Sequence, residues 1–428
     1  MASMENPCIP EQFDHPLNLT EVVDAALCSN PQTREVWATS RIYAAQTGVA
    51  KAAYLPSADL NAAVSRSQSG SASGTNQSSI GFSLSYLLYD FGARAASLEA
   101  AQLQLAAASA SQDSTVQAIF LAAVQAFYQA QATAAALDAA LESERAANES
   151  FSAAAARYSA GSATLADKLQ AQTAWSQATL NRITAEGSLK NAQGNLANIL
   201  GLDANRNVSL AAASTTAIPA DFDGDIAALI EQARQHRPDM QAAAAQVKAA
   251  QASADASRAA DKPTLSLGAS ANQNNIAGSS TNSSSIGINL RVPIFSGFSP
   301  TYRIRAAEAQ VESRTAQLER LRLQVALDVW TAYQNLTTST QSLRTTANLL
   351  DSAEQSERVA LGRYKAGVGS ILDVLNAQSA LASARQQRIQ SLFNWDINRA
   401  ILAQSMGNLD TNLLQALSSN QPELDKRE

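Results

Sequence analysis

Residues 157–161 read Arg-Tyr-Ser-Ala-Gly, and residues 363–367 read Arg-Tyr-Lys-Ala-Gly, 206 positions further along the chain. The same correspondence joins Pro56 to Pro263, at an offset of 207. Chance does not keep an offset within two residues over landmarks spread along a 428-residue chain. The sequence therefore indicates an internal duplication, and each half is expected to form the same elements in the same order.

Each half begins with a helical pattern and continues with a β-hairpin, a long helix and a return helix. The first repeat is expected over residues 19–203 and the second over residues 226–407. Residues 1–18 form an N-terminal segment, residues 204–225 a linker, and residues 408–428 a C-terminal tail. The expected elements are a helix over 19–53, a hairpin over about 56–90, a long helix over 93–159 and a return helix over 165–200, then a helix over 226–260, a hairpin over about 263–296, a long helix over 301–363 and a return helix over 371–406.

The two long helical patterns contain no proline in the stretches 93–159 and 301–363. Each runs for about 65 residues, or roughly 100 Å at 1.5 Å per residue, which exceeds the size of a compact domain. Gly161 and Gly367 follow them, at positions where glycine allows the chain to reverse after a helix. Each half therefore predicts a long antiparallel helical hairpin, and the fold class is mainly α with a pair of β-hairpins.

One strand in each hairpin alternates apolar and polar residues with a period of two. The apolar set would lie on one face of a sheet and the polar set on the other: Ile80, Phe82, Leu84, Ile286, Ile288 and Leu290 against Ser83, Ser85, Asn289 and Arg291. A surface that faces lipid, with a polar and water-filled lumen behind it, explains this pattern. The alternative is a soluble sandwich with a solvated polar face, but helices of this length do not fit a sandwich protein.

Four strands are too few to close a barrel, and lipid does not tolerate open sheet edges, so other copies of the chain must complete the sheet. Two copies would supply eight strands and three would supply twelve, and both numbers are within the range of membrane barrels. The chain has no run of 18 or more apolar residues, so we do not expect a helical membrane span.

The net charge of −6 is spread along the chain, and no basic patch points to a nucleic-acid partner. Residues 1–16 lack the basic start and apolar stretch of a signal peptide, so we interpret the sequence as a mature or trimmed form whose export is inferred. Cys8 and Cys28 are the two cysteines, and an oxidising periplasm would let them form a disulfide. The alternatives are two unrelated small residues or a lipid on Cys8.

Enzymatic activity is not predicted. Asp90-Phe91-Gly92 copies a kinase tripeptide, but no glycine-rich phosphate loop or strand-borne lysine accompanies it. His15 and His236 are the only histidines, and neither belongs to a recognisable metal-ligand or catalytic spacing. We therefore expect no catalytic residues, no metal and no cofactor.

The duplicated order of helix, hairpin, long helix, turn and return helix resembles the TolC family of outer membrane factors. The turn sequence from Arg363 to Gln378 resembles the family's periplasmic tip, and Tyr54-Leu55-Pro56 resembles the start of its first strand. The similarity extends from about Leu19 to Gly407. The resemblance implies a homotrimer with a twelve-stranded transmembrane β-barrel in the outer membrane and a long α-helical barrel in the periplasm, to which the linker and the tail contribute equatorial segments.

The resemblance also implies partners and a function. The channel would dock on a periplasmic adaptor, or membrane fusion, protein and on an inner-membrane ABC or proton-driven transporter, in order to export proteins by type I secretion or drugs and small molecules. We favour protein secretion slightly, on overall resemblance. The alternative function is a soluble periplasmic coiled-coil scaffold, which the alanine- and glutamine-rich helices favour but the duplicated hairpins do not explain.

The resemblance assigns roles to residues of the two tips. Asp373 would line the periplasmic gate, and Asn376 stands where a second acidic residue is found in the family. Tyr364 would donate a hydrogen bond to Asp167 in the closed state, while Gly369 stands where some members have an arginine. The alternatives are that Asp373 is an ordinary solvated acid at a helix start and that Tyr158 and Tyr364 are packing residues under the turns.

Overall fold

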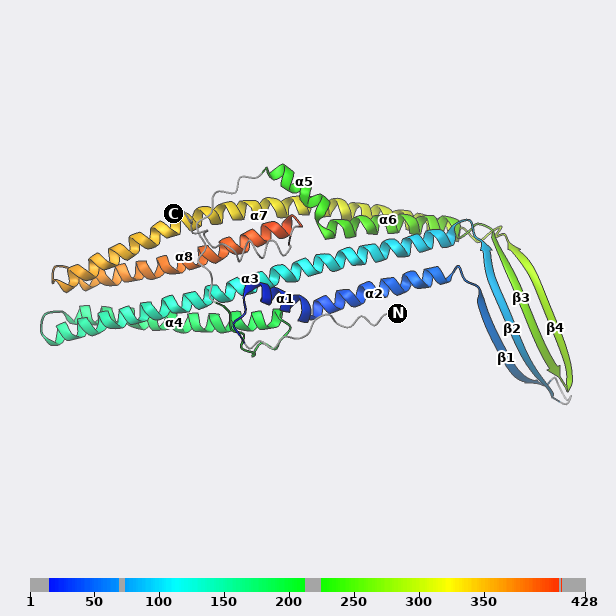
Figure 1. Ribbon diagram of the computed structural model, residues 1–428, viewed down its shortest axis with the longest axis horizontal. Coiled ribbons are helices and arrows are strands. Elements are labelled where there is room, and N and C mark those ends of the chain that lie inside the picture. Colours follow the sequence, from blue (N-terminus) through cyan, green and yellow to red (C-terminus); the bar gives the residue numbers. More distant parts are fainter. Residues whose placement is uncertain (1–14, 69–73, 212–224, 408, 410–428) are drawn as a thin grey trace, which may run out of the picture. The chain divides into compact units, whose positions relative to one another are not determined.

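The computed structural model describes residues 15–68, 74–211, 225–407 and 409. Its first repeat contains helices α1 (Leu19–Ser29) and α2 (Pro31–Ala52), strands β1 (Ser57–Ser67) and β2 (Thr75–Tyr89), and helices α3 (Ala93–Ser159) and α4 (Leu165–Ile199). Its second repeat contains α5 (Ile226–His236), α6 (Pro238–Ala259), β3 (Thr264–Ile276), β4 (Ser279–Arg291), α7 (Ser299–Lys365) and α8 (Ile371–Ser405). Figure 1 labels these elements. None of the helices in the described residues is both long and apolar enough to cross a membrane.

The expected single helix at the start of each repeat is wrong, because each repeat begins with two helices. The break falls at Asn30 (ψ 129°) in the first repeat and at Arg237 (ψ 126°) in the second. Each of these residues precedes a proline, whose ring disfavours the helical conformation in the residue before it. The proline itself then begins the next helix, where its missing N–H would have had no helical partner.

The four strands form one antiparallel sheet in the order β1-β2-β3-β4. The outer pairs are local hairpins, whereas the central pair joins β2 of the first repeat to β3 of the second. The pairing of β2 with β3 shifts between Leu87 and Tyr89, at the end of the sheet that adjoins the helices (Figure 1). The sheet therefore holds the two repeats together, and β1 and β4 are its edges.

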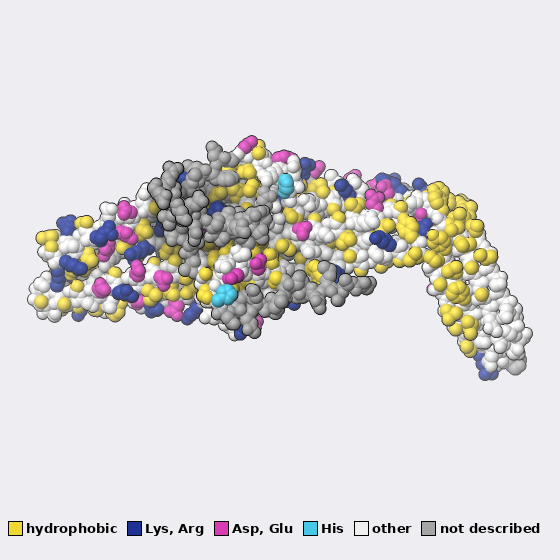
Figure 2. All heavy atoms as spheres, viewed as in Figure 1, with side chains coloured by type: hydrophobic (Ala, Val, Ile, Leu, Met, Phe, Trp, Pro, Cys, Tyr) yellow, Lys and Arg dark blue, Asp and Glu magenta, His cyan; other side chains and the backbone are white. Residues whose placement is uncertain are grey.

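The strand register separates apolar from polar side chains as the alternation predicted. Leu84 pairs with Ala269, which pairs with Ile286, and residues that are directly opposite in an antiparallel sheet share a face. Ser83 lies opposite Ser270 on the other face. The apolar face is uncovered in the single chain, since Ile286 is 78% exposed. Figure 2 shows these hydrophobic side chains gathered at the end of the sheet nearest the helices.

The chain divides into two compact units, which we call the helical unit and the sheet unit. The helical unit comprises residues 1–35, 113–237 and 323–428, and the sheet unit comprises residues 36–112 and 238–322. The main core of the helical unit joins α1, α3 and α4 with Phe393 and Ala400 of α8. A second cluster joins α7 to α8, where Trp395 donates a hydrogen bond to the Thr340 hydroxyl at 3.1 Å.

Gly201 lies at the end of the first helical hairpin, where it allows a close approach. Its φ is +72°, and a Cβ there would lie 2.6 Å from the carbonyl oxygen of Ser29. We expect Gly201→Ala to lower the free energy of unfolding by about 3 kcal/mol, because it adds a clash to left-handed backbone strain. Denaturant titration measures this.

Gly161→Ala is the matched control for this change. Gly161 has a similar φ of +75°, but a Cβ there would meet nothing within 4 Å. This variant adds only the backbone strain, so its free energy of unfolding should fall by about 1 kcal/mol. Equal losses in the two variants would show that the approach to Ser29 is unimportant.

Candidate functional site

The turns at the ends of the two helical hairpins begin their return helices with the same capping arrangement. The carboxylate of Asp167 accepts hydrogen bonds from the Thr164 backbone N–H at 2.9 Å and the Thr164 hydroxyl at 2.8 Å. Asp373 accepts from the Ser370 backbone N–H at 3.3 Å, and its own N–H donates to the Ser370 hydroxyl at 3.1 Å. Both acids are therefore capping-box residues, which stabilise the first turn of α4 and of α8.

The hydrogen bonds to Asp167 also affect its titration. The Thr164 backbone and then its side chain lower the pKa of Asp167 from its ordinary value, because both stabilise the charged carboxylate. Asp167 thus carries a full negative charge at neutral pH on the exposed tip of the first hairpin.

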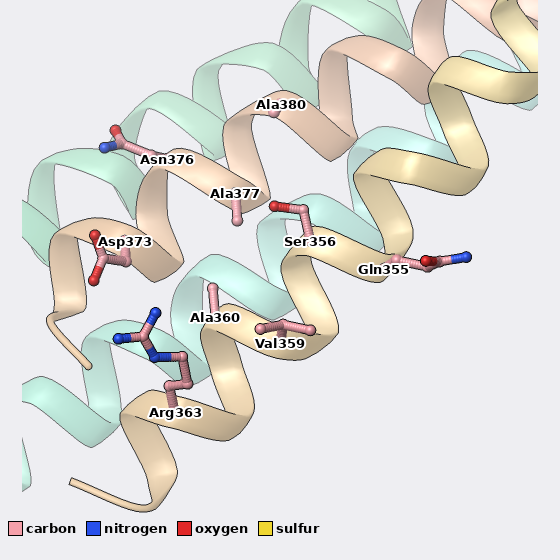
Figure 3. Close-up of a pocket in the computed structure, with 9 residues that line it drawn as sticks. All are labelled: Gln355, Ser356, Val359, Ala360, Arg363, Asp373, Asn376, Ala377 and Ala380. Carbon is pink, nitrogen blue, oxygen red and sulfur yellow. The ribbon is translucent and has the colours of Figure 1, made fainter. Parts of the chain in front are cut away.

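A groove of about 590 Å³ lies between α7 and α8 near the second tip (Figure 3). It contains both residues that the resemblance assigned to the gate, Asp373 and Asn376, which α8 presents together. Arg363 of α7 lies across from Asp373, and the remaining lining is small or apolar except for the amide of Gln355. The lining residues are Gln355, Ser356, Val359, Ala360, Arg363, Asp373, Asn376, Ala377 and Ala380.

The guanidinium of Arg363 alters the electrostatics expected for this groove. One acid and one base now line it, whereas sequence reasoning considered only the acid. No ion pair within 4.0 Å joins Arg363 to Asp373 in the described residues, so each charge is available to a third group. The signal for Arg363 was present in the sequence, since the duplication aligns it with Arg157.

Tyr364 is 7% exposed and packs between the two hairpins close to their turns. Its cluster contains one or two residues from each of α3, α4, α7 and α8: Ala154, Ala171, Tyr364, Ile371 and Val374. The hydroxyl makes no hydrogen bond to Asp167 in the part of the chain that the structure describes. The predicted closed-state bond between Tyr364 and Asp167 therefore stays a prediction.

Arg157 makes the contact that connects the two hairpins at this level. Its guanidinium carbon lies 4.1 Å from the centroid of the Tyr364 ring, and Nη2 donates a hydrogen bond to the Tyr364 carbonyl at 2.9 Å. We call this two-point contact the Arg157 clasp. It joins the end of α3 to the end of α7, and sequence reasoning missed it because the partner is a backbone carbonyl on another helix.

The remaining tip residues show how far the repeats have diverged. Tyr158, the counterpart of Tyr364, is exposed, and the Lys168 ammonium lies 5.6 Å from its ring centroid. Gly161 and Gly367 have φ values of +75° and +77° at the two turns. Gly369 lies against Arg363, whose Cβ would be 3.0 Å from a Cβ at that position. The second tip therefore has a buried tyrosine where the first has an exposed one.

The other candidate residues do not gather into a site. His15 lies 3.2 Å from Glu21, and His236 contacts the Gln232 carbonyl within its own helix. No group of metal-binding side chains occurs in the described ranges. Cys28 belongs to α1, while Cys8 lies outside the described residues, so the disulfide stays a prediction.

Comparison with known proteins tests the resemblance. The sequence profile of the outer membrane efflux protein family matches residues 22–202 and 229–408, which are the two repeats. The chain belongs to the outer membrane efflux protein family. The predicted family is thus confirmed.

Members of the outer membrane efflux protein family align with almost the whole chain. Protein CyaE of Bordetella pertussis is 37% identical over 394 residues, covering 90% of this chain and 82% of that protein. Outer membrane protein TolC of Vibrio cholerae is 24% identical over 402 residues, covering 92% of this chain and 91% of that protein. The Campylobacter jejuni CmeC outer membrane channel has the same fold, with a TM-score of 0.82, 18% identity, and coverage of 99% of this chain and 95% of that one.

Proposed function

We propose that this chain is one protomer of an outer-membrane export channel. The observation that carries the proposal is the four-stranded sheet, which has one continuous apolar face and two unpaired edges, β1 and β4. Lipid would cover the apolar face, and neighbouring copies would pair with the edges. Three copies give the twelve-stranded barrel of the proposal, and the long helical hairpins form the periplasmic duct below it.

The proposed channel works with partners that supply energy and cargo. A periplasmic adaptor would contact the helical tips, and an inner-membrane transporter would deliver the cargo through it. We propose proteins as the cargo, with drugs and small molecules as the second candidate. Deleting the gene tests the two classes, because protein export predicts loss of a secreted polypeptide and drug export predicts raised antibiotic susceptibility.

Oligomeric state is the first test of this function. In detergent the protein should sediment as a trimer, run as a trimer on an unheated gel, and become a monomer after heating. The reason is that an open four-stranded sheet leaves both edge strands without hydrogen-bond partners. A monodisperse monomer in detergent, measured by light scattering, would contradict the channel.

Asp373 provides the test at the gate. In a trimer its carboxylate would appear three times around the axis, so Asp373→Asn should lower cation over anion selectivity and weaken block by divalent cations in planar bilayers. Asn376→Asp adds a second carboxylate to the same groove and should act in the opposite direction.

Asp167→Asn is the matched control, because Asp167 has the same capping role in the first tip but lies outside the groove. The gate hypothesis predicts that this control retains wild-type selectivity. If Asp167→Asn and Asp373→Asn change selectivity equally, the effect comes from loss of the helix cap, and Asp373 is not a gate residue.

A further inference from the structure

Charged side chains are almost absent from the four strands. The central strands β2 and β3 contain none, and the edge strands contain Asp59 and Arg66 in β1 and Arg291 in β4. Figure 1 shows these two strands at opposite edges of the sheet. Every residue of β1 and of β4 is exposed in the single chain, so the chain itself covers neither edge.

Asp59 and Arg291 share the polar face of the sheet, whereas Arg66 lies on the apolar face. Asp59 is opposite Ser83 on the polar face, and this row ends at Ser285 of β4. Arg291 follows Ser285 at an even spacing and therefore has the same face. Three strand separations keep the two charges more than about 14 Å apart within one chain. Neither takes part in an ion pair among the described residues.

The helical end of the sheet shows that the strands are offset from one another. The row that starts at Ser57, the first residue of β1, ends at Gly287 of β4. β4 nevertheless continues for four more residues, to Arg291, before the chain turns toward α7. From β1 to β4, the end of the sheet that adjoins the helices therefore shifts by four residues relative to the rows.

The other limit of the apolar face is offset in the same direction. On this face Val64 is the last apolar residue of β1, and Ile286 is the first apolar residue of β4. Ile286 lies in the row that starts at Ala58, six residues before Val64. Both limits of the apolar face thus cross the rows obliquely, as they do when strands tilt in a barrel.

The junction between copies continues this offset. One further strand step, from β4 to β1 of the next copy, extends it to about five to eight residues per copy, and a strand tilt of about 35–45° in a barrel of twelve strands corresponds to about four to six. The shift must be even, because an odd one would join the polar face of one copy to the apolar face of the next. Six residues is the even value that satisfies both ranges.

A shift of six residues places Arg291 of one copy directly opposite Asp59 of the next. We propose that β4 pairs with the neighbouring copy's β1 in this register, and that the two side chains form an ion pair on the lumen face, an inference that rests on the proposed trimeric channel. One such pair lies at each of the three junctions. With shifts of four or eight residues the same side chains are diagonal neighbours, which an arginine can still span.

The opposite charges of the two edges also select how copies assemble. A two-fold arrangement that pairs β1 with β1, or β4 with β4, places charges of one sign on the lumen face of the junction. Pairing β4 with β1 joins opposite charges and continues the antiparallel order of the sheet. The edges therefore favour a closed ring of copies over a two-fold dimer.

Cysteine pairs on the lumen face test the register. Asn61→Cys with Asn289→Cys are directly opposite at a shift of six, Asn61→Cys with Gly287→Cys at four, and Ala63→Cys with Asn289→Cys at eight. A disulfide requires Cβ atoms within about 3.5 to 4.5 Å, so after mild oxidation only the first pair should give a covalent trimer that survives heating without reductant. The single variants are controls for the native cysteines and should give monomers after heating.

Each outcome of the cross-linking separates the register from the channel. A covalent trimer from either of the other two pairs overturns the proposed register. If no pair cross-links in a protein that is trimeric in detergent and conducts ions in planar bilayers, β4 and β1 do not pair in this way, and the inference fails while the channel stands. A protein that is monomeric in detergent refutes the channel itself.

Charge reversal tests the ion pair. Asp59→Arg places two guanidinium groups at each junction, so less than about one tenth of this variant should remain trimeric at the temperature where half of the wild-type trimer dissociates on gels. Asp59→Arg with Arg291→Asp exchanges the charges and should restore the wild-type fraction. Asp59→Arg with Arg66→Asp has the same net charge but leaves Arg291 without a carboxylate on its face, and should dissociate like the single variant. Equal dissociation of the two double variants, or a single variant as stable as the wild type, overturns the ion pair.

Discussion

Asp396→Asn is expected to raise the free energy of unfolding by up to about 4 kcal/mol above pH 7. Asp396 lies on α8 and is only 5% exposed. Burial raises its pKa to about 7, and the Arg399 guanidinium, 3.9 Å away, opposes this shift without cancelling it. Tyr128 of α3 faces the same carboxyl group, and burial together with the Asp396 charge raises the pKa of Tyr128 as well.

The direction of the pH dependence follows from these values. The folded chain holds the Asp396 proton up to about pH 7, whereas the unfolded chain releases it near the ordinary value of 3.8. The stability that depends on this proton is therefore complete below pH 3.8 and is lost as the pH rises to 7. Asparagine stays neutral at every pH, so the gain should be larger at pH 8 than at pH 5.

Denaturant titration at these two pH values measures the effect. Asp138→Asn is the control, because Asp138 is exposed on α3 and its replacement should change little at either pH. If Asp396→Asn leaves the difference in stability between pH 5 and pH 8 as large as in the wild type, the buried carboxyl does not cause it.

Arg157→Gln is expected to raise the conductance of the assembled channel severalfold. The change removes the hydrogen bond to the Tyr364 carbonyl and the contact with its ring, and thus frees the end of α3 from the end of α7. A hydrogen bond from a charged donor contributes about 1.5 to 3 kcal/mol, and the cation–π contact about 0.5 to 2 kcal/mol. Three protomers would lose it together. Single-channel recording in planar bilayers measures the result.

Two variants distinguish the Arg157 clasp from a hydrogen bond between Tyr364 and Asp167. Arg363→Gln alters the corresponding arginine of the second repeat, for which the described residues show no such contact, and should leave the conductance unchanged. Tyr364→Phe keeps both the ring and the carbonyl, so the clasp predicts wild-type conductance. A bond from Tyr364 to Asp167 predicts the opposite, since phenylalanine removes its donor. If Tyr364→Phe raises the conductance while Arg157→Gln leaves it at the wild-type value, the Arg157 clasp is refuted.

The order of the elements could be predicted from the sequence because it depends on local patterns. A period of two placed the strands, and the absence of proline placed the long helices. The breaks at Asn30 and Arg237 were missed although Pro31 and Pro238 follow them, because the helical pattern continues on both sides of each proline. A proline that begins a helix and one that ends a helix look alike in a run of this kind.

Residues of the tip were harder to assign. The capping boxes have a local signature, a hydroxyl residue three positions before an acid, and both Thr164 and Ser370 fit it. The Arg157 clasp and the groove at Arg363 depend on side chains and carbonyls from separate helices. Spacing along the chain does not determine such contacts, so only the packed structure reveals them.

The central strand pair has a consequence for the time course of folding. Gln77 pairs with Ile276, so strands roughly 200 residues apart must meet before the sheet is complete. The hairpins β1–β2 and β3–β4 form from neighbouring segments and need no such encounter. Pairing over so long a separation is slow, because the entropy of closing the loop is lost before the ladder of hydrogen bonds is gained. The β1–β2 hairpin should therefore remain without its central partner until β3 and β4 have been synthesised and have met it, and its apolar face needs protection from aggregation during that interval.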